Sequence, residues 1–311
     1  MCGCFVRCSR KESYLGAIKH SYGLETAAHT ELLCEVKFAS FSSLRFWFRH
    51  NLPSKIQNME PGVVKIAEDS DFDMLKSLVD SDTDWKLEYD KGGGTKVWSK
   101  PTKNCSFNMV KIHTVFPNVN ANTLFDVLLD PDYRKDWDEH MLQSIEIGYL
   151  NPNNDIGYYS LFCPSPVKNR DFVLQRSWLD MGSEKLILNH SIEHKDYPPK
   201  KGFVRAISYL TGYVIRSTKM GCFLGYISQT DPRGKLPSWL CNKLTQKFAP
   251  KVVQQLLHAS QGYENWKHSQ INPNYKPWVY PELTLDVPRV SVKDCKAVTA
   301  VSYAECEDDE S

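Results

Sequence analysis

The residues with the clearest chemistry in this chain are Arg134 and Asp138, which lie in the segment DYRKDWD, residues 132–138. In a helix, side chains four residues apart lie on one face and can meet. The carboxylate can then hold the guanidinium while other N–H donors stay free, and such donors suit the oxygens of a phosphate. The same spacing is typical of surface ion pairs, which contribute about 0 to 1 kcal/mol. The segment alone leaves both interpretations open.

Motifs of catalysis and of metal binding are missing from the sequence. GxSxG and HExxH do not occur, and KGGGTK at residues 91–96 joins two predicted strands, as a hairpin turn does. His190 and His194 are four residues apart, but in a predicted strand this spacing does not converge on an ion. We therefore expect a protein that is not an enzyme and that has no metal site.

The composition indicates a globular protein of nearly balanced charge. The 311 residues are 41% hydrophobic and 24% charged, with a formal net charge of +1. Proteins that bind nucleic acid usually have a basic excess or a basic stripe, so nucleic acid is not an expected partner. No run approaches the roughly 20 apolar residues of a membrane span. The first residues also lack the apolar core of a secretory signal, and we expect a cytoplasmic location.

Three cysteines near the N-terminus form the second group with possible chemistry. Cys2, Cys4 and Cys8 are flanked by basic residues, and acyl groups beside a basic patch can anchor a protein to a membrane. A flexible tail with reactive thiols is the alternative, and it has equal weight. Residues 1–62 show no clear period, and we interpret them as a flexible extension.

The elements that must position Arg134 and Asp138 follow from the hydrophobic pattern. Helical spacing occurs at residues 69–79 and again at 122–130, directly before the pair. Alternating or continuous apolar runs, separated by turn-rich pieces, predict strands. These strands cover residues 85–89, 95–100, 106–116, 143–150, 156–163, 170–179, 185–194, 203–217 and 222–230. Nine strands with one inner helix favour a long, curved antiparallel sheet.

A long amphipathic helix is predicted after these strands. Apolar residues recur every three to five positions from Leu240 to Leu257, and the helical pattern ends near Trp266. Pro250 lies inside this helix, where a proline loses an amide donor and clashes with the preceding turn, so we expect a kink. Residues 281–311 are expected to be an acidic, disordered tail. Ser302 in this tail fits an acid-directed kinase site.

These elements and several longer strings together resemble the START lipid-transfer domain. The strings are DYRKDWD at residue 132, GYYSLFCPSPVKNRDF at 157, YPPKKGFVRA at 197 and GKLPSWLCNKLTQKFAP at 234. The resemblance covers about residues 68–280, so we expect a lipid-binding domain at 63–280 between the two flanking regions. It implies an α+β helix-grip fold, in which a curved nine-stranded antiparallel sheet and the long C-terminal helix enclose a tunnel for one lipid.

The resemblance also assigns residues to the lipid headgroup. In phosphatidylcholine-binding members the arginine of DYR contacts the phosphate and the aspartate of the WD pair holds it, which implies these roles for Arg134 and Asp138. Tyr159, Phe172 and Tyr209 correspond to the aromatic cage around choline. Ordinary packing is the other interpretation of these three rings. The strongest known cage has tryptophan and tyrosine where this chain has Tyr159 and Phe172, so phosphatidylethanolamine stays open as a second ligand.

The family also implies a gate, made by the loop at residues 164–169 and the C-terminal helix. Pro164 and Pro166 restrict the loop and Pro250 offers the helix a bend point, although both loop prolines suit a simple turn as well. The expected function is transfer of a glycerophospholipid between membranes by a monomer that contacts their surfaces transiently. The phospholipid is its cargo, and no other cofactor is expected. A membrane-tethered lipid sensor is the alternative function.

Overall fold

The computed structural model describes residues 64–90, 92–102, 105–165, 167–234, 236 and 238–296. Several predictions fall outside these residues. They concern the extension at 1–62 with Cys2, Cys4 and Cys8, the loop residue Pro166, and the end of the tail with Ser302.

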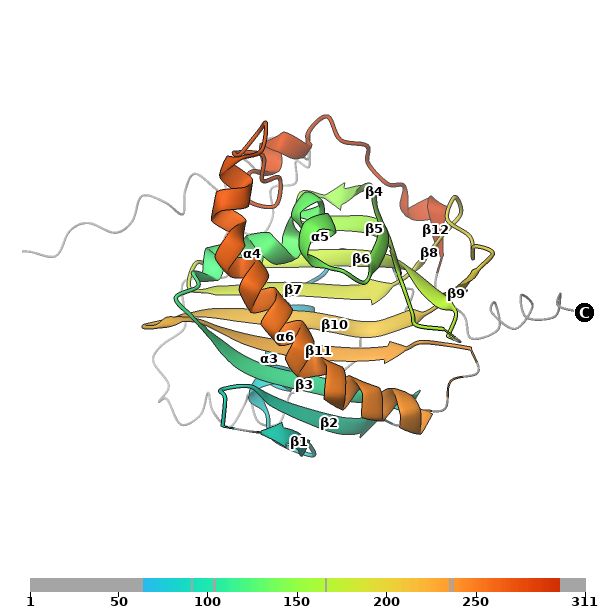
Figure 1. The fold of residues 1–311 in the computed structure, drawn as a ribbon. Helices are drawn as coiled ribbons and strands as arrows, with labels where there is room; N and C mark the ends of the chain where they lie inside the picture. The colour runs from blue at the N-terminus through green and yellow to red at the C-terminus, as the bar shows by residue number, and fades with distance from the viewer. Residues whose placement is uncertain are drawn as a thin grey trace, which may run out of the picture. The chain divides into compact units, whose positions relative to one another are not determined.

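A large antiparallel sheet forms the centre of the described chain, and the α-helices pack around it (Figure 1). Its strand order is β1-β2-β3-β11-β10-β7-β6-β5-β4, and each neighbouring pair is antiparallel. The strands are β1 Lys86–Asp90, β2 Lys96–Thr102, β3 Cys105–Pro117, β4 Met141–Asn151, β5 Asn154–Leu161, β6 Asn169–Asp180, β7 Glu184–Ser191, β10 Ile207–Thr218 and β11 Gly221–Asp231. The predicted nine-stranded sheet and the α+β fold class are confirmed.

Two of the predicted strands are each divided in the structure. The run at 185–194 forms β7 and a short β8, Glu193–His194, and the run at 203–217 forms β9, Phe203–Arg205, and β10. At the second break the backbone N–H of Ala206 donates to Asp171 O at 3.0 Å, and β9 pairs in parallel with the start of β6. The hydrophobic pattern of the sequence does not show such a break, because the chain continues through it while the backbone changes its hydrogen-bonding partner.

One helix packs against one face of the sheet. Helix α3, Asp69–Asp80, places Leu75 and Val79 against β10 and β11, where both side chains are fully buried. Gly212 and Gly225 lie directly below them, and a Cβ atom at either glycine would collide with the helix side chains. This face of the sheet is therefore closed by close packing.

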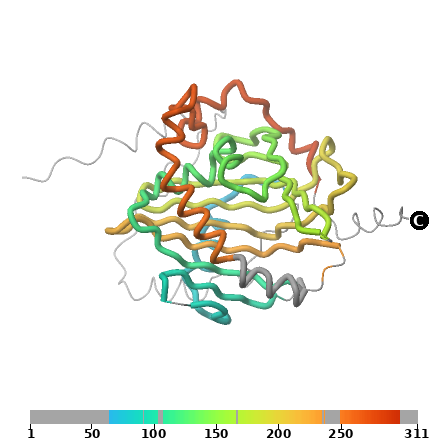
Figure 2. Tube along the Cα trace, viewed as in Figure 1, coloured from blue at the N-terminus to red at the C-terminus, as the bar shows by residue number. Residues whose placement is uncertain are grey.

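The other helices lie on the opposite face, which we call the concave face. Helix α6 runs diagonally across it (Figure 2), and its apolar side chains pack with those of α4 and of strands β3, β10 and β11. The predicted long helix is confirmed, and α6 continues through Pro250. These helices are α4 Ala121–Leu129, α5 Pro131–Trp137 and α6 Ser238–His268.

Asp130 fixes the position of α5, the helix that carries Arg134. Its carboxylate accepts the backbone N–H groups of Asp132 and Tyr133 at 3.0 and 3.2 Å, which caps the helix start. The same carboxylate accepts the Tyr263 hydroxyl at 3.0 Å and the Lys267 ammonium at 2.8 Å, both from α6. Because α4 ends at this residue too, one buried carboxylate joins all three helices.

The chain after α6 differs from the predicted disordered tail as far as residue 296. It forms two short 3-10 helices, Pro281–Thr284 and Val292–Asp294, and the strand β12, Cys295–Lys296, which pairs with β8. The backbone of Tyr149 on edge strand β4 donates to Pro288 O and accepts from Val290 N, at 3.2 and 2.9 Å. The segment satisfies backbone groups that an open edge would leave unpaired, a role that its composition does not reveal.

Candidate functional site

Strands β10 and β11 show opposite burial on their two faces. Most side chains under α3 are buried, whereas several on the concave face keep part of their surface accessible although α6 crosses this face. The buried residues include Leu210, Val214 and Ile227, and the accessible ones include Thr211, Tyr213, Tyr226 and Ser228. The concave face is therefore not completely filled by protein side chains, and a ligand has surface to contact there.

Arg134 points from α5 toward this face and meets Asp138 as the sequence predicts. Asp138 follows the last residue of α5, and its Oδ2 lies 3.4 Å from Arg134 Nε. The guanidinium also lies over two rings, 5.4 Å from the centre of Trp137 and 5.5 Å from that of Tyr159. Its side chain is 29% exposed, and the Nε atom is buried without a hydrogen bond. The pair is thus neither a solvated surface bridge nor a fully satisfied buried one.

Tyr159 connects this pair with the predicted aromatic cage. Its hydroxyl donates to Asp138 Oδ2 at 2.8 Å, so it helps to orient the carboxylate that faces Arg134. Tyr159 on β5 stands opposite Phe172 on β6, with ring centres 6.5 Å apart and the rings tilted by 40°. The structure brings these two cage residues together. Tyr209 lies on β10, which β7 separates from β6, and is half-buried at a bulge between Ser208 and Leu210.

Tyr213 is a member of the site that the motifs did not reveal. It lies on the concave face of β10 and interacts electrostatically with Arg134, and its ring centre lies 5.1 Å from that of Tyr226 on β11, with the two rings tilted by 49°. Burial raises the pKa of the Tyr213 hydroxyl, which therefore stays neutral. Counting every second residue in the predicted strand would have placed it on one face with Thr211, but only the structure shows that Arg134 faces it.

The electrostatics of the site keep Arg134 charged. Burial lowers the pKa of its guanidinium, but Tyr159, Tyr213 and Asp138 outweigh this effect and raise that pKa above its usual value. Burial likewise raises the pKa of the Tyr159 hydroxyl. The guanidinium is a permanent cation with one carboxylate at ion-pair distance. An N–H group without an acceptor can donate to an anionic oxygen of a ligand.

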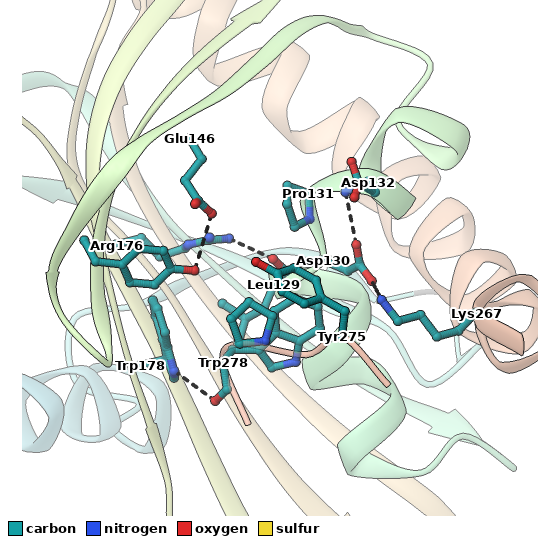
Figure 3. A pocket seen from close by; sticks show the side chains of 12 residues that line it. Leu129, Asp130, Pro131, Asp132, Glu146, Arg176, Trp178, Lys267, Tyr275 and Trp278 are labelled. Carbon is teal, nitrogen blue, oxygen red and sulfur yellow. Dashed lines mark hydrogen bonds and ion pairs between the residues drawn. The ribbon is translucent and has the colours of Figure 1, made fainter. Parts of the chain in front are cut away.

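A separate pocket lies beside this site (Figure 3), between the α4–α5 junction, strands β4 and β6 and the segment after α6. Its lining contains two cations, but both are already paired. Arg176 bonds to Asp155 and to Leu129 O at 3.3 Å, and Lys267 bonds to Asp130. None of the predicted lipid-binding residues lines this pocket. The comparison favours Arg134 over these two cations as a binding group for an anion.

The described gate residues lie in the loop after β5 and in helix α6. Pro164 is exposed in the loop after β5, and this loop is closed by bonds from Val167 N to Pro164 O and from Cys163 N to Asn169 Oδ1, both at 3.0 Å. Pro250 is half-buried in α6. The gate stays a prediction.

Comparison with known proteins decides the family. The sequence profile of the START domain matches residues 65–265. The chain belongs to the START domain family. This START domain is 41% identical to mouse START domain-containing protein 10 over 221 residues, which cover 70% of the chain and 75% of the relative. It is 28% identical to rat phosphatidylcholine transfer protein over 185 residues, covering 58% of the chain and 85% of that protein.

The known structures of the family agree with this assignment. The crystal structure of human STARD10 superimposes with a TM-score of 0.73 at 37% sequence identity, covering 77% of this chain and 97% of that structure. The resemblance that the motifs predicted is therefore confirmed. Within the described residues no helix of this START domain is long and apolar enough to span a bilayer, and no cluster of three or more metal-ligating side chains occurs.

Proposed function

We propose that this START domain binds one glycerophospholipid on its concave face and transfers it between membranes, with Arg134 as the ligand of the lipid phosphate. The observation that carries the proposal is the incomplete set of partners around Arg134, a charged group next to accessible surface. The names of two relatives support the same function, because one is a START domain-containing protein and the other a phosphatidylcholine transfer protein. The second name states transfer, and neither name states a catalytic activity, so we infer no enzymatic activity.

In the proposed complex, Asp138 orients the guanidinium and the phosphodiester completes its hydrogen bonds. Tyr159 holds Asp138, and the neutral Tyr213 hydroxyl stands beside the guanidinium as a further donor. A hydrogen bond to a charged group contributes about 1.5 to 3 kcal/mol. The anionic phosphate then supplies acceptors for guanidinium N–H groups that Asp138 alone does not satisfy.

We assign the ammonium of the headgroup to the rings near Phe172. The Arg134 guanidinium already lies over the Tyr159 ring, so a second cation gains more from Phe172, and from Tyr209 across the sheet. These aromatic partners favour the quaternary ammonium of phosphatidylcholine. Phosphatidylethanolamine is the proposed second ligand, because its ammonium needs hydrogen-bond acceptors as well as rings.

Transfer also requires transient contact with a membrane surface and a way in for the lipid. We propose that the loop after β5 and helix α6 separate to admit it, as the family pattern implies. Phe162 at the start of this loop is 49% exposed and Val252 on α6 is 47% exposed, so both offer apolar surface to a bilayer. A sensor without net transfer, anchored through Cys2, Cys4 and Cys8, is the alternative, and it would bind lipid without moving it.

The decisive experiment compares Arg134→Met with Lys135→Met in a vesicle-to-vesicle transfer assay with fluorescent phosphatidylcholine. Lys135 is the matched control, because it lies next in the same helix, is 55% exposed, and pairs with the exposed Asp132. Loss of a charged hydrogen bond should reduce lipid loading and transfer by about tenfold or more in Arg134→Met. Lys135→Met should behave as the wild type. Normal loading of Arg134→Met, measured by mass spectrometry of bound lipid, would refute the phosphate role.

A further inference from the structure

Four hydroxyl side chains form a row on the concave face, which we call the hydroxyl row. Ser208 Oγ and Thr211 Oγ1 are 3.0 Å apart, Thr211 Oγ1 and Ser228 Oγ are 3.4 Å apart, and Ser228 Oγ and Thr230 Oγ1 are 3.2 Å apart. The row crosses two strands, because Thr211 on β10 stands opposite Ser228 on β11. It is continuous from one strand to the other.

The hydroxyl row has more donors than it uses. Four hydroxyls supply four O–H donors, and the three contacts between them use at most three. Among the described residues, at least one donor therefore has to find its acceptor outside the row. Thr211, Ser228 and Thr230 are only half-buried, so the row faces the part of the concave face that protein does not fill. A ligand there gains from a hydrogen-bond acceptor.

The position of the hydroxyl row relative to Arg134 indicates which group of the ligand accepts its hydrogen bond. Tyr213 and Tyr226 form the neighbouring pair on the same face, two residues along each strand from Thr211 and Ser228, and Tyr213 lies near enough to Arg134 for the two groups to interact electrostatically. Two residues of a strand span about 7 Å. In a glycerophospholipid the ester carbonyl groups follow the phosphate after the short glycerol unit. A phosphate at Arg134 therefore brings an ester carbonyl close to the row.

We propose that the hydroxyl row is a subsite for the ester carbonyl oxygens of the lipid, with Thr211 and Ser228 as its central donors. The inference rests on the proposed function and adds a specificity to it. A diacyl lipid supplies the acceptors that the row needs. A dialkyl ether lipid with the same headgroup has no carbonyl, so it offers the row no such acceptor. The row makes the protein prefer ester-linked to ether-linked phospholipid.

The test is a loading competition with the full chain. Vesicles contain equal amounts of diacyl and dialkyl phosphatidylcholine of the same chain length, and mass spectrometry measures the ratio of the two bound lipids. The wild type should favour the diacyl form by about three- to tenfold, the range that one neutral hydrogen bond gives. Thr211→Val and Ser228→Ala should bring the ratio close to one, and Thr211→Ser, which keeps the hydroxyl, should preserve it.

Thr114→Val is the matched control, because it removes a hydroxyl contact of 2.9 Å between Thr114 on another strand, β3, and Thr95, which directly precedes β2. It should keep the wild-type ratio. A purely structural row would lower the melting temperature of Thr211→Val without changing its ratio, and that result overturns the proposal. So does a wild-type ratio near one, or a shift in headgroup preference instead of linkage preference. Uptake of neither lipid by the wild type would instead refute the proposed function itself.

Discussion

Arg134 and Arg205 are two arginines of one domain with very different sets of partners. Arg205 is 4% exposed, and its Nε and Nη2 bond to the two carboxylate oxygens of Asp171 at 3.0 Å each. It also donates to the carbonyl groups of Tyr197 and Pro198 at 3.1 and 3.2 Å. Arg134 has one carboxylate oxygen at 3.4 Å and an Nε without a hydrogen bond. The first set of partners is complete and the second is not.

The difference teaches how structural and ligand-binding polar groups can be told apart in this domain. A buried charge is tolerated when its surroundings satisfy it, and Arg205 is satisfied by the protein alone. Arg134 keeps accessible surface, and its Nε has no acceptor among the described residues. A similar contrast separates the two sheet faces near this site, since Leu210, Val214 and Ile227 under α3 are buried whereas Thr211, Tyr213 and Tyr226 on the concave face are half-buried. We therefore expect changes at polar groups that the protein satisfies, such as Arg205, to lower stability, and changes at groups that it does not satisfy, such as Arg134, to reduce lipid binding.

The largest expected effect is on stability, at the complete site. Asp171→Asn leaves the buried Arg205 without its counter-charge, and breaking a buried pair in this way costs about 3 to 5 kcal/mol. Asp138→Asn, the equivalent change at Arg134, should cost at most about 1 kcal/mol, because a partly exposed pair contributes little. Urea denaturation measures both changes. Equal losses in the two variants would remove the distinction between the sites.

The next effect concerns the packed face. Leu75→Ala removes a fully buried side chain that rests on Gly212, and it should lower the free energy of unfolding by about 3 kcal/mol. Leu78→Ala, the same change one turn along at a half-buried position of α3, should cost clearly less. Lipid loading per folded molecule should stay at the wild-type level in both. Loss of loading in folded Leu75→Ala would show that the α3 face takes part in binding.

The sequence predicts the elements well and the partners of individual side chains less well. The spacing of Arg134 and Asp138 and the positions of the strands along the chain follow from local patterns. Tyr213 and the hydroxyl row depend on which strand faces which helix, and a local pattern contains no such information. The ordered segment at 281–296 is a similar case, because it is held by backbone bonds to β4 and β8 that any residues can make.

The smallest expected effect is a difference in pH dependence between the two faces. His113 lies under α3, where its Nε2 donates to Val79 O at 3.0 Å, and burial first and Lys111 second lower its pKa below 6.5. Below pH 6.5 the unfolded chain therefore binds a proton that the folded chain does not, so stability falls as pH decreases until the folded pKa is passed. Asp80 and Asp82 nearby oppose this effect without reversing it. The melting temperature should decline as the pH is lowered from 8 to 5.5. The decline should be less steep in His113→Gln, whose amide cannot titrate but can still donate a hydrogen bond to Val79 O.

The headgroup site should not follow this trend. The pKa values of Arg134, Tyr159 and Tyr213 are all raised, so none of these groups changes its charge between pH 8 and 5.5. A phosphodiester also keeps its charge over this range. Phosphatidylcholine loading, measured well below the melting temperature, should therefore be constant while stability falls. A parallel decline of loading and stability would mean that the site depends on the packed face, and that the two regions are not independent.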